Sequence, residues 1–412
     1  MFIRKPLYYN AFYLMANSAA ASLLGFVFWN VVTRYYTPAQ AGIGTALLAA
    51  SNLVVFIGNL GLETSLVRFI PEARENTVKF INTSLTTAAA FTILGSFIYL
   101  AGIGYWSPAL SFIARRFVLA AVFVLTSVSI GLSGLIDQCL VAGRAARLVF
   151  YKNLLANLVK IPLPLLMLQW GGMAVFVASS TAVTSGVILA FILFLPLIYP
   201  HYRPLPTFKP SLLKPLIRYS LGNYVSNFFM YGVNLLFPLI ILYCLGPEYS
   251  AYFYIAWMLN SVAGVVAGGM VNSLLAEGAN DPAQFKTNLR RSLISTLVLL
   301  VPAALGCYIA GPWLLGLFGG DYAANGKALL RWLAISNFPA AIGYFFITVN
   351  QIQKKIRLII LQAVMSFFLV LGLGYGLMKI YGLPGAGMSF LLAHSIIALF
   401  VTVPLWRHMR RG

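Results

Sequence analysis

A few ionisable side chains lie in stretches that are otherwise apolar, and Lys160 is the clearest case. It comes about twelve residues into the stretch 148–168, so in a helix it would lie about 18 Å from one end, near the middle of a bilayer core about 30 Å thick. Charge within hydrocarbon is costly, and an intramembrane lysine therefore indicates a functional site, unless it snorkels outward or pairs with a carbonyl. Pro162 and Pro164 follow it and should kink the helix.

Asparagines accompany these charges. Asn59 and Glu63 follow Asn52 by 7 and 11 residues, which is about two and three helical turns, so the three side chains would share one face of a continuous helix. Such a face should line a water-filled cavity, while hydrogen bonding between helices is the alternative for any single asparagine. The predicted substrate-binding residues are Arg34, Lys160, Asn17, Asn30, Asn52, Asn59, Asn227, Asn234 and Asn260.

The charges in this set favour an anionic guest. Lys160 and Arg34 are cationic and few acids accompany them, so phosphate or pyrophosphate fits best. Glu63 and Asp137 are the candidate sites for a coupling proton or sodium ion, although we expect Asp137 to pair with Arg144 or Arg147. No cofactor is predicted, because the three cysteines and three histidines are scattered without metal-ligand spacing.

The elements that carry these residues are predicted to be membrane helices. Hydrophobic residues make up 60% of the 412 residues, charged residues 9%, and the mean hydropathy is +0.87. Spans of about 20 apolar residues are expected in an all-α polytopic membrane protein. We predict twelve, near 10–33, 40–62, 78–103, 113–141, 148–168, 173–199, 216–242, 250–275, 288–310, 326–350, 356–378 and 384–405.

The sequence repeats itself after 209 positions. Lys5, Pro6 and Leu7 correspond to Lys214, Pro215 and Leu216, and Pro38 corresponds to Pro247. The repeat predicts two parallel six-helix bundles, 1–200 and 216–412, around a central cavity, joined by a Pro-rich cytoplasmic linker at 201–215. The buried charge is not repeated, because Arg34 corresponds to Tyr243 and Glu63 to Asn272.

The net charge of +20 is explained by topology. One side of the predicted membrane carries 21 of the 28 Lys and Arg residues and the other side carries six, with Lys160 counted on neither. The positive-inside rule then places both termini in the cytoplasm of a plasma (inner) membrane protein, and a nucleic-acid partner is not expected. We interpret the aromatic run from Tyr243 to Trp257 as an interfacial belt.

The segments 34–42 (RYYTPAQAG) and 58–68 (GNLGLETSLVR), followed by Pro71 and Glu72, resemble the opening of the oligosaccharide and polysaccharide flippases of the Wzx type. These flippases belong to the multidrug, oligosaccharidyl-lipid and polysaccharide exporter superfamily. The resemblance implies alternating access, by which a lipid-linked oligosaccharide moves from the cytoplasmic to the outer leaflet, and basic cavity residues that hold its phosphate. It also implies membrane lipids and the glycosyltransferases or polymerase of the pathway as partners.

Two other functions are weighed against this one. A cation-coupled multidrug antiporter of the same superfamily needs desolvated carboxylates in its cavity, and the sequence offers Glu63 and little else. A scaffold of an envelope-polymer assembly would have no use for paired polar faces. An enzyme is not expected, because Gly326 and Lys327 lack the spacing and the Ser or Thr of a nucleotide-binding loop.

Overall fold

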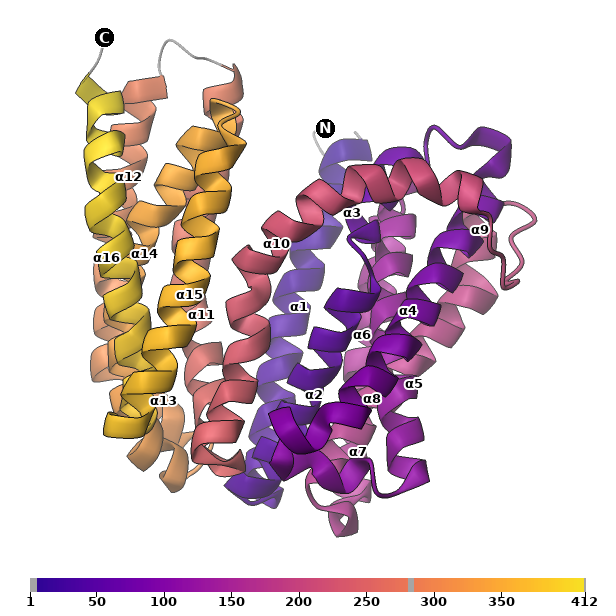
Figure 1. The fold of residues 1–412 in the computed structure, drawn as a ribbon, viewed down its shortest axis with the longest axis horizontal. Coiled ribbons are helices and arrows are strands. Elements are labelled where there is room, and N and C mark those ends of the chain that lie inside the picture. Colours follow the sequence, from indigo (N-terminus) through magenta and orange to yellow (C-terminus); the bar gives the residue numbers. More distant parts are fainter. Residues whose placement is uncertain (1–5, 281–284, 411–412) are drawn as a thin grey trace. The chain divides into compact units, whose positions relative to one another are not determined.

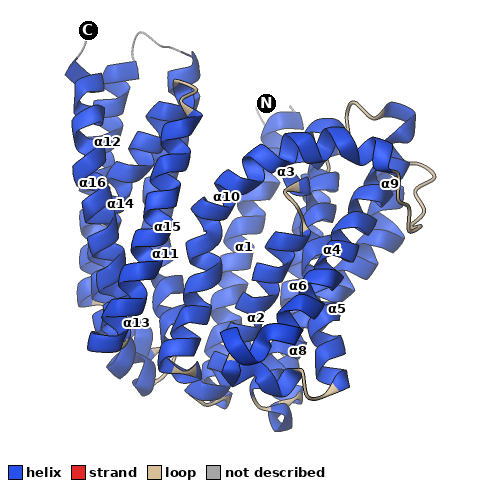
Figure 2. Ribbon diagram, viewed as in Figure 1, coloured by secondary structure: helices blue, strands red, loops and turns tan. Residues whose placement is uncertain are grey.

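The computed structural model describes residues 6–280 and 285–410, and every regular element in these ranges is a helix (Figure 2). This confirms the all-α class. Ten helical segments of the described chain are long and apolar enough to cross a bilayer. The protein is therefore a multi-pass membrane protein.

The long helices follow one another with short connections. Up to residue 200 they are α1 (Pro6–Tyr35), α2 (Pro38–Gly58), α4 (Thr77–Trp106), α5 (Phe117–Ala142), α6 (Ala146–Lys160) and α8 (Gly172–Leu189), which continues through the π-helical η5 (Ala190–Phe194) into α9 (Leu195–Ile198). After it come α10 (Pro210–Leu245), α11 (Pro247–Asn280), α12 (Phe285–Ile309), α14 (Gly320–Ile352), α15 (Ile356–Tyr381) and α16 (Leu383–Arg410). The short helices are α3 (Leu62–Phe69), η2 (Arg74–Asn76), η3 (Pro108–Ile113), α7 (Leu163–Leu166), η4 (Leu168–Trp170) and α13 (Gly311–Gly316).

Two of the twelve predicted spans are not among the ten. The stretch 148–168 is divided, because α6 ends at Lys160 and α7 covers only four residues. Pro162 and Pro164 lack the N–H that a continuing helix needs, so the expected break is present. The stretch 250–275 lies within α11, a helix in which several side chains lie outside the described residues.

The chain forms two compact units that divide between Val225 and Ser226. The parallel relation between its halves stays a prediction. The proline-rich connection has no helix from Tyr199 to Lys209, and α10 then begins at Pro210.

In the first unit α2 packs against α4, α5 and α8, while α6 packs against α1 and α8 (Figure 1). Glycines allow the helix backbones to approach closely. A Cβ on Gly58 of α2 would lie 2.7 Å from the Thr92 Cα of α4, and a Cβ on Gly44 would lie 2.6 Å from the Val175 Cβ of α8. These contacts are typical of membrane helices, which associate largely through close packing of small residues.

Local chemistry sets where these helices begin and turn. Thr37 caps α2 in a capping box with Gln40, and Pro38 occupies the first turn, where its missing N–H is not needed. The turn between α5 and α6 places Arg144 in the left-handed region with φ 56°. A non-glycine residue there is strained, and the tightness of this turn brings α5 and α6 side by side as a hairpin.

In the second unit α14 packs against α11, α12, α15 and α16. Aromatic rings fill much of its interior, and the Phe237 ring lies 4.9 Å from the Phe390 ring. The interfacial-belt interpretation is wrong for part of the run that it covered. Phe253 is only 4% exposed and stacks on Trp257, whose ring lies 5.0 Å from Phe390. These rings pack inside the unit, whereas Tyr243 is 55% exposed.

Candidate functional site

Lys160 is the last residue of α6, immediately before the proline break. Its Nζ lies 4.0 Å from the centre of the Phe28 ring on α1, which is cation–π geometry. Among the described residues no carboxylate oxygen lies within 4.0 Å of this Nζ. The lysine therefore keeps an unbalanced positive charge at the position where the sequence predicted one.

Lys160 lines a cavity of about 100 Å³ between α5, α6 and α8. The polar residues around it are Ser133, Lys152, Asn153, Asn157, Lys160 and Ser179. Space is left by small residues, since Ala156, Ala182 and Gly186 complete the wall. A polar cavity of this size has room for several water molecules.

An ion pair lies beside this cavity. The Lys152 Nζ is 2.7 Å from Asp137 Oδ1, and it also donates to the Ser133 hydroxyl at 2.6 Å and the Ser133 carbonyl at 3.2 Å. Lys152 is only 1% exposed, and Asp137 is 21% exposed. The expected pairing of Asp137 with Arg144 or Arg147 is wrong, because its carboxylate faces α6 across the hairpin and not the turn.

Asparagines extend the network to α1. Asn153 Nδ2 donates to Asp137 Oδ2 and to Asn17 Oδ1, both at 3.2 Å, and Asn157 Nδ2 donates to the Asn153 carbonyl at 2.8 Å. Asn17 is thus brought to the charged cluster. The pair of Asp137 and Lys152 is neutral as a whole, so Lys160 gives the cavity its net positive charge.

Glu63 and Asn59 form a separate contact. Asn59 Nδ2 donates to Glu63 Oε1 at 2.9 Å. The prediction of one continuous helix is wrong here, because α2 ends at Gly58 and Glu63 belongs to α3 after a left-handed Gly61. Asn52 is exposed on α2, whereas Asn59 is 4% exposed, so the expected polar stripe is not uniform.

Arg34 and Asn30 lie further along α1. Arg34 is exposed in the last turn of that helix, six residues after Phe28, which is about 9 Å along the axis. Asn30 is partly buried and has interactions with neighbouring groups. Neither residue lines the cavity at Lys160.

The predicted residues of the second half are dispersed. Asn260 Oδ1 accepts a hydrogen bond from Asn337 Nδ2 at 2.9 Å, which is the interhelical alternative. Asn227 is partly buried on α10, and Asn234 lines a pocket within the second unit. The side chain of Asn272, the repeat partner of Glu63, lies outside the described residues.

Several residues of the cavity were missed from the sequence, above all Lys152, which was counted with the positive charge of the cytoplasmic side. A signal for it does exist. Asp137 lies seven residues before Arg144 and Lys152 eight residues after it, so an antiparallel hairpin turning at Arg144 brings both to nearly the same depth.

Comparisons with known proteins give this arrangement a context. Residues 31–325 match the family model described as "Polysaccharide biosynthesis protein". No curated protein matches the sequence. Many solved structures have a similar fold, and three of them are described next.

An inward-closed structure of the lipid II flippase MurJ has a TM-score of 0.75 at 15% identity, over 95% of this chain and 87% of that one. An inward-facing multidrug resistance MATE family transporter of the MOP superfamily has a TM-score of 0.66 at 16% identity, over 93% of this chain and 94% of that one. A MOP superfamily transporter from Pyrococcus furiosus has a TM-score of 0.59 at 15% identity, over 97% of this chain and 94% of that one. These structures show the fold, and because the family model covers well over half of the sequence, this chain belongs to the polysaccharide biosynthesis protein family.

Proposed function

We propose that this protein is a flippase that moves a lipid-(pyro)phosphate-linked oligosaccharide from the cytoplasmic to the outer leaflet by alternating access. The observation that carries the proposal is Lys160, a cation without an acidic partner in the described chain, on the wall of a polar cavity inside an apolar unit. A lysine without an acidic partner inside an apolar unit calls for a functional reason, and an anionic guest supplies it.

The neighbouring groups suit a phosphate. Lysine binds phosphate as a point charge with three donors, and the Asn157 amide, which uses one of its two N–H groups on the Asn153 carbonyl, adds a further donor at the same cavity. The lipid chain of the substrate would remain in the bilayer while the phosphate enters the protein. Arg34, exposed at the end of α1, is suited to contact the phosphate at another stage of its passage.

Membrane potential favours the proposed direction. Moving one negative charge outward across an inside-negative membrane releases about 2.3 kcal/mol per 100 mV, and a pyrophosphate with two uncompensated charges gains roughly twice that. The excess of Lys and Arg on one side of the predicted membrane supports a plasma membrane location with both termini in the cytoplasm. A proton or sodium ion could contribute at Glu63.

Export of cationic drugs fits the cavity less well. The Asp137 carboxylate is already neutralised by Lys152 at 2.7 Å, and Lys160 would repel a cation. The family of the chain and the charge of its cavity thus support the same class of substrate.

The test is transfer of a polyprenyl-pyrophosphate-linked oligosaccharide across reconstituted vesicles. Lys160→Met should lower the rate at least tenfold, which corresponds to about 1.4 kcal/mol, while Lys160→Arg should retain part of it. Lys79→Gln, an exposed lysine on α4, is the control. If Lys160→Met and Arg34→Ala both transfer the lipid at the wild-type rate, the anion-binding mechanism is wrong.

A further inference from the structure

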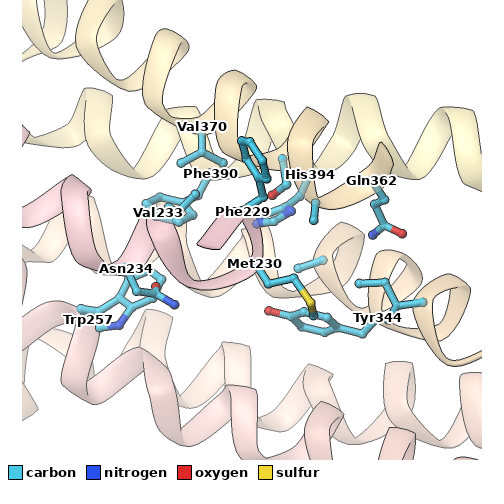
Figure 3. A pocket seen from close by; sticks show the side chains of 14 residues that line it. Phe229, Met230, Val233, Asn234, Trp257, Tyr344, Gln362, Val370, Phe390 and His394 are labelled. Carbon is cyan, nitrogen blue, oxygen red and sulfur yellow. The ribbon is translucent and has the colours of Figure 1, made fainter. Parts of the chain in front are cut away.

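The second unit contains its own pocket of about 150 Å³, built by α10, α11, α14, α15 and α16. Asn234, Trp257, Phe390 and His394 are among the side chains arranged around it (Figure 3). Among the residues that the structure describes, no Lys, Arg, Asp or Glu lines it. This pocket is therefore chemically unlike the cationic cavity of the first unit.

The size of the pocket indicates the size of its guest. An engineered protein cavity of about 150 Å³ holds a benzene molecule, so a volume of this kind accepts one six-membered ring. That engineered cavity is lined only by apolar groups. Here polar side chains share the wall with aromatic ones, so the ring that fits should carry polar substituents.

The polar side chains around the pocket are free to bind a guest. In the described part of the chain, Asn234, Gln362 and His394 line the pocket and make no side-chain hydrogen bond. A polar side chain without a partner in a pocket loses free energy when water is excluded, so hydrogen bonds to a guest would stabilise these three side chains.

The combination of groups selects the chemistry of the ring. Amide and imidazole side chains both donate and accept hydrogen bonds, as sugar hydroxyls do. Trp257 and Phe390 pack against each other with their ring centres 5.0 Å apart, and the parts of these rings that line the pocket offer apolar surface to the C–H groups of a sugar. An isoprenoid chain would leave the polar groups unpaired, and an anion would find no cation among the lining residues.

We infer that this pocket binds one neutral pyranose ring, and that in the proposed flippase it recognises a sugar of the lipid-linked oligosaccharide. The second half of this statement rests on the proposed function. The two units then bind different parts of the substrate, since Lys160 in the first unit binds the phosphate and the uncharged pocket of the second unit binds a sugar.

Binding can be tested without any transport. Purified wild-type protein should give saturation-transfer NMR signals with at least one member of a panel of methyl glycosides, including glucoside, galactoside, mannoside and N-acetylglucosaminide. Asn234→Leu and Gln362→Leu should each weaken that binding about three- to tenfold, the effect of one lost hydrogen bond. Gln351→Leu, which removes an exposed amide from α14, is the matched control. If no glycoside binds, or if both pocket variants bind like the wild type, the inference is overturned.

Transport separates this site from that of the phosphate. Asn234→Leu and Gln362→Leu should slow transfer of the sugar-bearing lipid but not of polyprenyl pyrophosphate without sugar, whereas Lys160→Met should slow both. An equal slowing of both lipids by the pocket variants would mean a merely structural role and contradict sugar recognition. If the wild type binds glycosides and transfers neither lipid, the pocket stands and the proposed function fails.

Discussion

Neutralising Asp137 should destabilise the first unit strongly, because it leaves Lys152 buried without its counter-ion. At 2.7 Å the two unit charges attract by about 6 kcal/mol at an effective dielectric constant of 20. Desolvation offsets much of this attraction, and removing one partner of a buried pair costs about 3–5 kcal/mol. We expect Asp137→Asn to fall in this range, since Lys152 is 1% exposed.

The double variant makes the prediction specific. Lys152→Met should be less harmful than Asp137→Asn, because Asp137 is 21% exposed and keeps its hydrogen bond from Asn153. With both changes no unpaired charge remains, and stability should return to within about 1 kcal/mol of the wild type, since buried pairs contribute little net stability. The pairwise coupling is then at least about 2 kcal/mol, because the losses of the two single variants together exceed that of the double variant by this much.

The assay is thermal unfolding of the purified protein in detergent, followed by loss of the monodisperse size-exclusion peak. The expected order of melting temperatures is wild type and double variant together, then Lys152→Met, then Asp137→Asn. If the double variant melts as low as Asp137→Asn, or if Asp137→Asn melts like the wild type, the ion pair is not what holds α5 to α6.

Two further predictions concern packing in the first unit. Gly58→Ala should destabilise it by about 1–3 kcal/mol, because the new Cβ would lie 2.7 Å from the Thr92 Cα. Gly104→Ala is the control, since Gly104 has open space around it, and this variant should melt at or slightly above the wild-type temperature. Equal melting temperatures of the two variants would contradict the close approach of α2 to α4. Tyr36→Phe removes a hydroxyl that donates to the Pro164 carbonyl at 2.5 Å, so it should lower the free energy of unfolding by about 0.5–1.5 kcal/mol. An unchanged melting temperature would show that this hydrogen bond does not hold the end of α1 to the proline break.

The elements of the fold were largely predictable because membrane helices must be long and apolar. Ten of the twelve predicted spans coincide with helices that could cross a bilayer. The break after Lys160 was also predictable, since proline acts within a few residues of its own position. The end of α2 was not, because Gly58 to Gly61 give only a weak turn signal in an otherwise helical pattern.

The site was predictable only where one residue carries the signal alone. Lys160 stands out because a charge in hydrocarbon is rare at any position. The partner of Asp137 depends on how α5 and α6 pack after their turn, and nearby arginines obscured Lys152. Likewise Trp257 was assigned to a belt because its position in sequence says nothing of Phe390, which lies over a hundred residues away and packs against it.

The central claim is most directly tested by the headgroup dependence of transfer in reconstituted vesicles. Wild-type protein should accelerate transfer of a polyprenyl-pyrophosphate-linked oligosaccharide over protein-free vesicles, and should do little for the same oligosaccharide on an uncharged polyprenol. Lys160→Met should remove most of that difference. Equal transfer of the charged and uncharged lipids by the wild type, or no acceleration of either, would contradict the account.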